Sequence, residues 1–281
     1  DLDGDGYDVL YSIVGSTDDS LVTIDTYTGV LEFISAPNYE SPTDSDSDND
    51  YAITIQASDS ERSTNQSVVI TVLDANDAPE FTSDTAFMVD ENTEITTVVA
   101  TVSATDEDGD NITFSISGTD SAEFSLDSND DLYFETAPDY ENPFDDDADN
   151  DYSFTITAND GTVDVTQPVE VRVNNLNDNS PTITNGNSIS IVENNTAVTT
   201  IVATDSDGDE LTYSISGTDS GLLSIDSSSG DLTFDSAPDY ENPTDADTNN
   251  SYKLKLSVSD GSDGFTTSQT FTITVTDDAT E

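Results

Sequence analysis

Aspartate residues alternate with other residues in three short stretches of this chain, at a spacing that suits a hard cation. Aspartates at i, i+2 and i+4 are the oxygen spacing of a calcium-binding loop. The three stretches contain Asp44, Asp46, Asp48 and Asp50; Asp145, Asp147, Asp149 and Asp151; and Asp245, Asp247 and Asn249. A solvated run of charge would have the same composition. Because the pattern recurs three times, we interpret it as an additional calcium site in each repeat.

Other acidic clusters recur in a fixed order between these stretches. In the middle of the chain they read "DEN", "DED", "DYE" and "NDG", followed by "NLNDN". Two carboxylates about 4 Å apart at an effective dielectric constant near 20 repel by roughly 4 kcal/mol, so such clusters oppose folding until cations enter. Calcium takes about six to eight oxygen ligands from carboxylates, amides and backbone carbonyls. The order of the clusters therefore predicts several bound calcium ions.

The overall composition excludes several classes of function. The chain has 61 acidic and four basic residues, with a formal net charge of −57, so it repels nucleic acid and anionic membranes. It has no cysteine and no histidine, which excludes disulfides, zinc fingers, thiol nucleophiles and histidine-based triads. No apolar run is long enough to cross a bilayer. A glycosidase carboxylate pair lacks the expected aromatic groove, and we expect no enzyme.

Strands must position these clusters, because polar and apolar residues alternate along most of the chain. The alternation predicts strands near residues 86–91, 96–104, 111–117, 152–158 and 168–175, and the pattern repeats later in the chain. Intrinsic disorder would fit the charge, but a disordered acidic tail has no reason to keep this alternation. Seven short strands in about 100 residues predict an all-β fold of seven-stranded Greek-key β-sandwiches in tandem.

Three units follow one another, with predicted boundaries at residues 1–78, 79–180 and 181–281. The linkers between them read "DANDAP" and "NLNDNSP", and they are too short to act as floppy tethers. The first unit opens with a segment that aligns with Asp106 and the residues after it, so its first two strands are missing. We expect an open sheet edge there, explained by truncation or by strands that another chain supplies.

The motifs of the three units resemble those of a known family. They are "VDEN" and "IVEN", "ATDEDGD" and "ATDSDGD", "DYEN", "ANDG" and "SVSDG", and the linker "LNDNSP". Together they resemble tandem cadherin repeats, of the Asp-rich, cysteine-free kind found in bacterial surface proteins. The resemblance covers the whole chain and implies calcium ions between successive repeats, which make the rod stiff.

The resemblance also implies which residues bind these ions. For the junction of the second and third units it implies Glu91, Asp139, Glu141, Leu176, Asn177, Asp178, Asn179, Asp205, Asp207 and Asp260. For the junction of the first and second units it implies Glu40, Asn76, Asp77, Asp106, Asp108, Asn111 and Asp160. Asn38 replaces an aspartate there, so we expect weaker binding on the first unit's side. Half-junctions are expected at Asp1 and Asp3, and at Glu193, Asp239, Glu241 and Asp277.

The function that follows is structural. We expect a calcium-rigidified extracellular stalk or adhesion module of a bacterial surface or secreted protein, because calcium is plentiful outside cells. The expected partners are calcium and homophilic or neighbouring-chain contacts, without nucleic acid or membrane insertion. Two alternatives stay open: a filament subunit completed by strand donation, and a polysaccharide-binding module with a glycan ligand.

Overall fold

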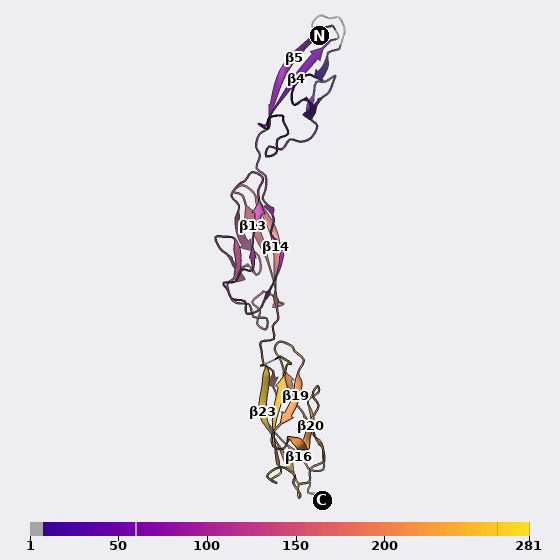
Figure 1. Cartoon of the computed structure of the whole chain (residues 1–281), viewed down its shortest axis with the longest axis vertical. Coiled ribbons are helices and arrows are strands. Elements are labelled where there is room, and N and C mark those ends of the chain that lie inside the picture. The colour runs from indigo at the N-terminus through magenta and orange to yellow at the C-terminus, as the bar shows by residue number, and fades with distance from the viewer. Residues whose placement is uncertain (1–7, 60, 263, 281) are drawn as a thin grey trace.

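The chain forms three β-rich units in a row. The structure, a computed structural model, describes residues 8–59, 61–262 and 264–280, and Figure 1 shows the units joined end to end by single stretches of chain. Across these described ranges, no helix has the length and apolar character needed to span a membrane. The helical elements are single 3-10 turns, one in each unit: η1 (Asp19–Leu21), η2 (Ser121–Glu123) and η3 (Ser220–Leu222).

The second unit contains two main sheets. The larger has the order β10 (Thr113–Ser117), β13 (Asp151–Asn159), β14 (Asp164–Asn174) and β7 (Ala86–Asp90), with β7 parallel to β14. The other has the order β11 (Phe124–Leu126), β12 (Asp131–Phe134) and β8 (Ala100–Thr101). A short pair joins β6 (Glu80–Phe81) to β9 (Ala104–Thr105).

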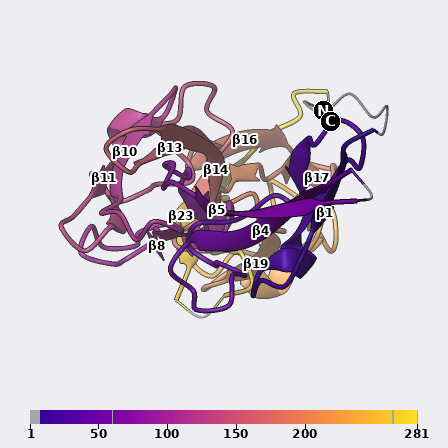
Figure 2. The same ribbon diagram turned by 90° about the horizontal axis from the view of Figure 1, so that it is seen from above.

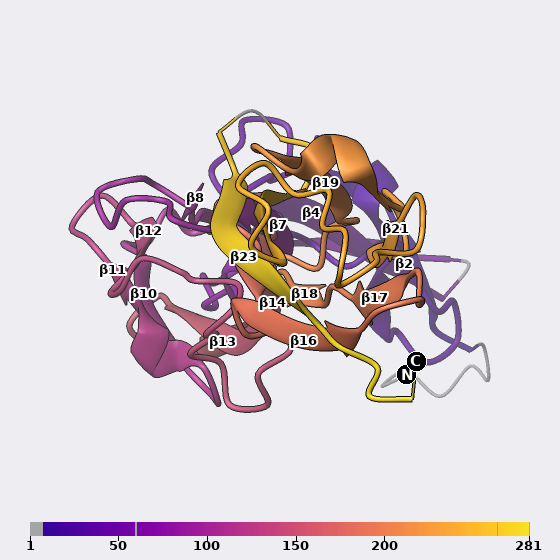
Figure 3. The ribbon, with the colours of Figure 1, turned by 90° about the horizontal axis from the view of Figure 1, so that it is seen from below.

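The third unit repeats this arrangement. Its larger sheet has the order β16 (Ser188–Val192), β23 (Thr266–Thr276), β22 (Ser251–Ser259) and β19 (Thr212–Ser216). Its other strands are β17 (Ala197–Thr200), β21 (Asp231–Phe234) and β20 (Leu223–Ile225), with the pair β15 (Thr182–Ile183) and β18 (Ala203–Thr204). Figure 3, seen from below, shows β16 beside β23.

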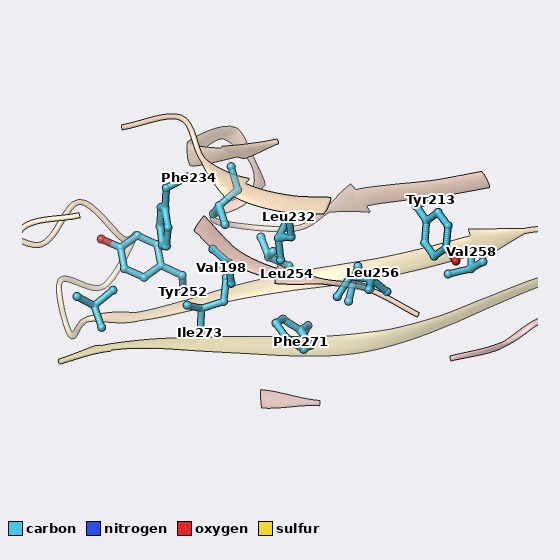
Figure 4. Packing of buried hydrophobic residues seen from close by; sticks show 13 residues of the cluster. Val198, Tyr213, Leu232, Phe234, Tyr252, Leu254, Leu256, Val258, Phe271 and Ile273 are labelled. Carbon is cyan, nitrogen blue, oxygen red and sulfur yellow. The ribbon is translucent and has the colours of Figure 1, made fainter. Parts of the chain in front are cut away.

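Each complete unit buries one core between its two sheets. Strand β13 alternates buried and more exposed residues, so one face of the strand supplies core side chains. In the third unit, the rings of Phe234 and Tyr252 meet edge to face across the sheets, with centroids 4.9 Å apart, and Leu232 and Phe271 pack nearby (Figure 4). The alternating pattern predicted from the sequence thus forms the core, and the predicted all-β tandem sandwich is confirmed.

The first unit has fewer strands. It consists of the sheet β1 (Leu10–Ile13), β4 (Asp50–Ser58) and β5 (Ser63–Thr71), and the pair β2 (Val22–Ile24) and β3 (Leu31–Phe33). Figure 2, which looks down on this unit, shows β4 beside β5. Among the described residues no strand pairs with the other edge of β5, where β7 and β16 pair in the later units. This is the open edge that the sequence predicts.

One predicted strand is wrong as a continuous element. Residues 96–104 form β8 and part of β9, which pair with different strands. Between them, the backbone N–H of Val102 donates to the Asp130 carbonyl, and the Ser103 carbonyl accepts from Thr82 and Ser83. The chain therefore changes partner at this point, which splits the strand.

Candidate metal centres at the unit junctions

Glu91 links three segments at the lower end of the second unit. Its side chain is 3% exposed at the end of β7. Oε1 accepts from the backbone N–H of Leu176 in the linker at 2.7 Å, and Oε2 accepts from that of Tyr140 at 2.9 Å. One oxygen each of Glu91, Asp139 and Glu141 lie within 4.8 Å of one another. A buried carboxylate thus fixes the linker beside two further acids.

The linker contacts the third unit directly. Asp207 Oδ2 accepts from the backbone N–H groups of Asp178 and Asn179 at 3.1 and 2.9 Å. The Asn179 amide donates both to Glu141 Oε2 at 3.2 Å and to Asp207 Oδ1 at 2.8 Å. Burial opposes ionisation of Asp207, yet these hydrogen bonds from Asn179 and Asp178 hold its pKa below the ordinary value. The two units therefore share a polar network.

Four oxygens of the residues predicted for this junction have no partner. Within the described part of the chain, Glu141 Oε1, Asn177 Oδ1, Asp205 Oδ2 and Asp260 Oδ2 are buried and make no hydrogen bond. Burial, together with the charges of Glu91 and Asp207, raises the pKa of Glu141 to about 7. A buried, unpaired carboxylate oxygen is costly unless a cation neutralises it. The residues present therefore fit a calcium site, since calcium prefers such oxygens.

The junction of the first and second units gathers a different acid set. Its clusters of oxygens within 4.8 Å comprise Glu40, Asp74 and Asp108; Glu40, Asp77 and Glu107; and Asp106, Asp108 and Asp110. Unpartnered buried oxygens recur at Glu40 Oε1, Asp106 Oδ2 and Asp108 Oδ1 among the described residues. The linker is held by Asp77 N–H to Asp108 at 2.7 Å and by the Asn76 amide to Asp160 at 2.9 Å. This junction therefore also fits a cation.

Sequence reasoning missed three members of this junction, Asp74, Glu107 and Asp110. Each lies within three residues of an acid that the motifs did select, so proximity along an acidic segment was the available signal. Asn111 is exposed, and the preceding residue, Asp110, contributes the carboxylate that lies beside Asp106 and Asp108.

In the first two runs of alternating aspartates, the earlier residues lie in a loop and the last residue lies at the start of a strand. Oxygens of Asp44, Asp46 and Asp48 lie within 4.8 Å of one another. In the second unit, the charge of Asp149, burial and the carboxylate of Asp145 raise the pKa of Asp147. The last aspartate of each of the first two runs begins a strand.

Cross-strand partners account for this exception. Asp50 lies opposite Thr71 in the register of β4 and β5 and accepts from its hydroxyl at 2.5 Å. Asp151 lies opposite Arg172 and accepts from its Nε at 2.5 Å. Asp50 and Asp151 therefore contact cross-strand partners in the structure.

The far end of the third unit reproduces the first half of a junction. Glu193 is 4% exposed and accepts from the backbone N–H groups of Tyr240 at 2.7 Å and Asp278 at 3.0 Å, as Glu91 does one unit earlier. Asp239 accepts from the N–H of Asn242 at 2.9 Å. The predicted half-junction at Asp1 and Asp3 lies outside the described residues.

Cadherin proteins resemble this chain over most of its length. The family model of the cadherin domain matches residues 187–276. The chain is 30% identical over 275 residues to the Fat-like cadherin-related tumor suppressor homolog of Drosophila melanogaster, which covers 90% of this chain and 6% of that protein. The chain therefore spans a small fraction of this curated relative.

Solved structures share the fold. The protocadherin GammaB4 extracellular domain has a TM-score of 0.69 at 21% identity, over 95% of this chain and 43% of that one. Domains EC22-24 of mouse cadherin-23 have a TM-score of 0.65 at 24% identity, over 96% of this chain and 87% of theirs. At this level of identity the likeness shows the fold of three consecutive units.

Proposed function

Because this chain belongs to the cadherin-like family, we propose that it is a calcium-rigidified segment of an extracellular stalk or adhesion protein. Calcium ions would bind at the two junctions between units 1–78, 79–180 and 181–281, and in the aspartate-rich loops. The parent protein would lie on a bacterial surface or be secreted, which suits an acidic chain without cysteine. Its contacts would be homophilic or with a neighbouring chain.

The observation that carries this proposal is the set of buried, unpartnered oxygens at the junction of the second and third units. Glu141 comes from the second unit, Asn177 from the linker, and Asp205 and Asp260 from the third unit. An ion bound by all three segments is present only when the two units are aligned, so binding stabilises the aligned state by mass action. Without calcium, the same oxygens repel one another and the junction bends.

Small-angle X-ray scattering of the full chain tests this proposal. In millimolar calcium we expect an extended rod, and in excess chelator a shorter mean dimension with a broader distribution. The variant Glu141→Gln removes one junction charge and should bend at one junction even in calcium. Glu135→Gln, an exposed residue on the same unit, is the matched control and should behave as the wild type. Identical scattering with and without chelator would refute the proposal.

The open edge of β5 favours a second candidate function, a filament subunit. Within the described part of the chain, one edge of β5 in the first unit has no paired strand, at the position where β7 and β16 pair in the later units, so a strand from another chain could pair there. Light scattering at rising protein concentration, combined with hydrogen exchange, separates the two candidates, because strand donation should protect the amides of β5 in the assembled chain and homophilic contacts elsewhere should not. The matched proteins are named as cadherins and protocadherins, which gives a polysaccharide ligand no support.

A further inference from the structure

The protein itself shapes the three aspartate loops, which we define as residues 44–49, 145–150 and 245–250. In the second unit, Asp120 Oδ1 accepts from the N–H of Asp146 at 2.9 Å, and Oδ2 accepts from that of Ser153 at 2.7 Å. The Asn150 amide donates to the Tyr140 carbonyl at 3.0 Å. Equivalent bonds hold the other two loops, through Asp18 and Asn49, and through Asp219 and Asn250. Hydrogen bonds within the protein therefore hold the backbone of each loop.

In each of the first two loops, one carboxylate oxygen has no hydrogen-bond partner among the described residues. Asp145 is 6% exposed, and its Oδ2 accepts from the N–H of Asp149 at 2.8 Å. Asp44 is 5% exposed, and its Oδ2 accepts from the N–H of Asp48 at 2.9 Å. In the part of the chain that the structure describes, Oδ1 of both residues is buried without a partner. An ionised oxygen in this position needs a positive charge beside it.

Further oxygens are available beside these two. Asp46 and Asp48 place oxygens within 4.8 Å of one from Asp44. The side chains of Asn49 and Asn150 are buried, and each has an Oδ1 without a partner among the described residues. Carboxylate and amide oxygens together form the ligand set of a hard divalent cation.

The third loop differs in its carboxylates, although Asn250 Oδ1, like that of Asn49 and Asn150, is buried without a partner among the described residues. Asp245 Oδ1 accepts from the N–H of Asn250 at 3.1 Å, so this buried carboxylate has protein donors on both oxygens. Asn249 replaces the third aspartate, so this loop has one carboxylate fewer. Its Oδ1 accepts from the N–H of Ser251 at 2.9 Å, as Asp48 and Asp149 accept the equivalent bond in the other loops. The Lys253 ammonium lies 3.9 Å from Asp247. In the third loop, both oxygens of the buried carboxylate thus accept hydrogen bonds, and the loop carries less negative charge.

From this contrast we infer that the loops of the first and second units each bind one calcium ion, and that the loop of the third unit binds none. The ligands would be Asp44, Asp46 and Asp48 in one loop, and Asp145, Asp147 and Asp149 in the other. This inference deepens the proposed function by narrowing its loop sites from three to two, and it rests on the premise that the chain works in calcium-rich surroundings. The loop ions lie within single units, so they would stabilise each unit without aligning its neighbours.

Ion counting by native mass spectrometry on the full chain in calcium tests the inference. Asp46→Asn and Asp147→Asn should each lose one ion relative to the wild type, whereas the matched variant Asp247→Asn should keep the full count. All three residues are exposed, so these substitutions should leave the fold intact. An unchanged count in Asp147→Asn, or an equal loss in Asp247→Asn, would overturn the inference.

Hydrogen exchange of the unmodified chain gives a second test that needs no variant. Calcium should slow exchange of the amides in residues 44–49 and 145–150, and should leave residues 245–250 unchanged. Equal protection of all three loops, or of none, contradicts the inference. Because Glu141→Gln acts only at a junction, it should leave loop protection intact. If chelator leaves the maximum dimension unchanged while calcium still slows exchange in the first two loops, the junction proposal is refuted and the loop inference stands.

Discussion

At the scale of single residues, three buried aspartates have a structural role that the acidic composition does not reveal. Asp18, Asp120 and Asp219 are 2%, 6% and 5% exposed, and each precedes a 3-10 turn. Their oxygens each accept a backbone N–H, one from the aspartate loop and one from the strand that follows it. The sequence holds a signal for them, the recurring Thr-Asp pair, but among 61 acids nothing marks these three as buried.

Replacing one of these aspartates should destabilise its unit. Asp120→Asn keeps one acceptor oxygen and turns a donor toward Asp146 or Ser153, so one buried N–H loses its partner. We expect a loss of about 1–3 kcal/mol in the free energy of unfolding. Urea denaturation in saturating calcium, followed by circular dichroism, measures the loss. Glu135→Gln serves as the exposed control, and an equally small effect of both substitutions would contradict this role of Asp120.

At the scale of elements, sequence periodicity predicts long strands better than short ones. The hairpin of β13 and β14 alternates strictly because one face of each strand is in the core, so its position could be predicted. The interval 96–104 could not, because β8 and β9 take different partners and periodicity carries no information about partners. The acid clusters were predictable by motif, whereas which oxygens converge depends on how the loops fold.

At the same scale, the close approach of two backbone segments requires a glycine at the turn before β21. Gly230 has φ +76°, and a Cβ there would lie 2.4 Å from the Ile201 carbonyl oxygen. This carbonyl belongs to the residue whose N–H donates to Gly230, so the contact joins β21 to the end of β17. Gly230→Ala should therefore cost at least about 1 kcal/mol.

Thermal unfolding of the full chain checks this cost. Gly221→Ala is the matched control, because a Cβ at Gly221 would meet no atom within 4 Å and its φ is not positive. We expect the transition of the third unit to shift only in Gly230→Ala. Equal shifts in the two variants would show that the backbone near Ile201 accommodates the added Cβ without a loss of stability.

At the scale of the whole molecule, a net charge of −57 acts on three units that are joined end to end (Figure 1). Two kinds of repulsion follow. Long-range repulsion acts between whole units and is screened by salt, with a Debye length of about 10 Å at 0.1 M and about 3 Å at 1 M. Short-range repulsion acts between junction oxygens within 4.8 Å of one another, where screening by mobile ions is weak.

Salt and calcium should therefore act differently on this chain. In excess chelator, raising sodium chloride from about 0.05 M to about 1 M should raise the melting temperature, because screening reduces repulsion in the compact state. It should not restore the extended dimension, since a screening ion is not held by the junction oxygens. In calcium the same salt should raise the melting temperature less, because it also weakens the attraction between calcium and the carboxylates. Thermal unfolding and scattering on the same samples separate these effects, and recovery of the rod by salt alone would show that net charge, rather than bound ions, controls its shape.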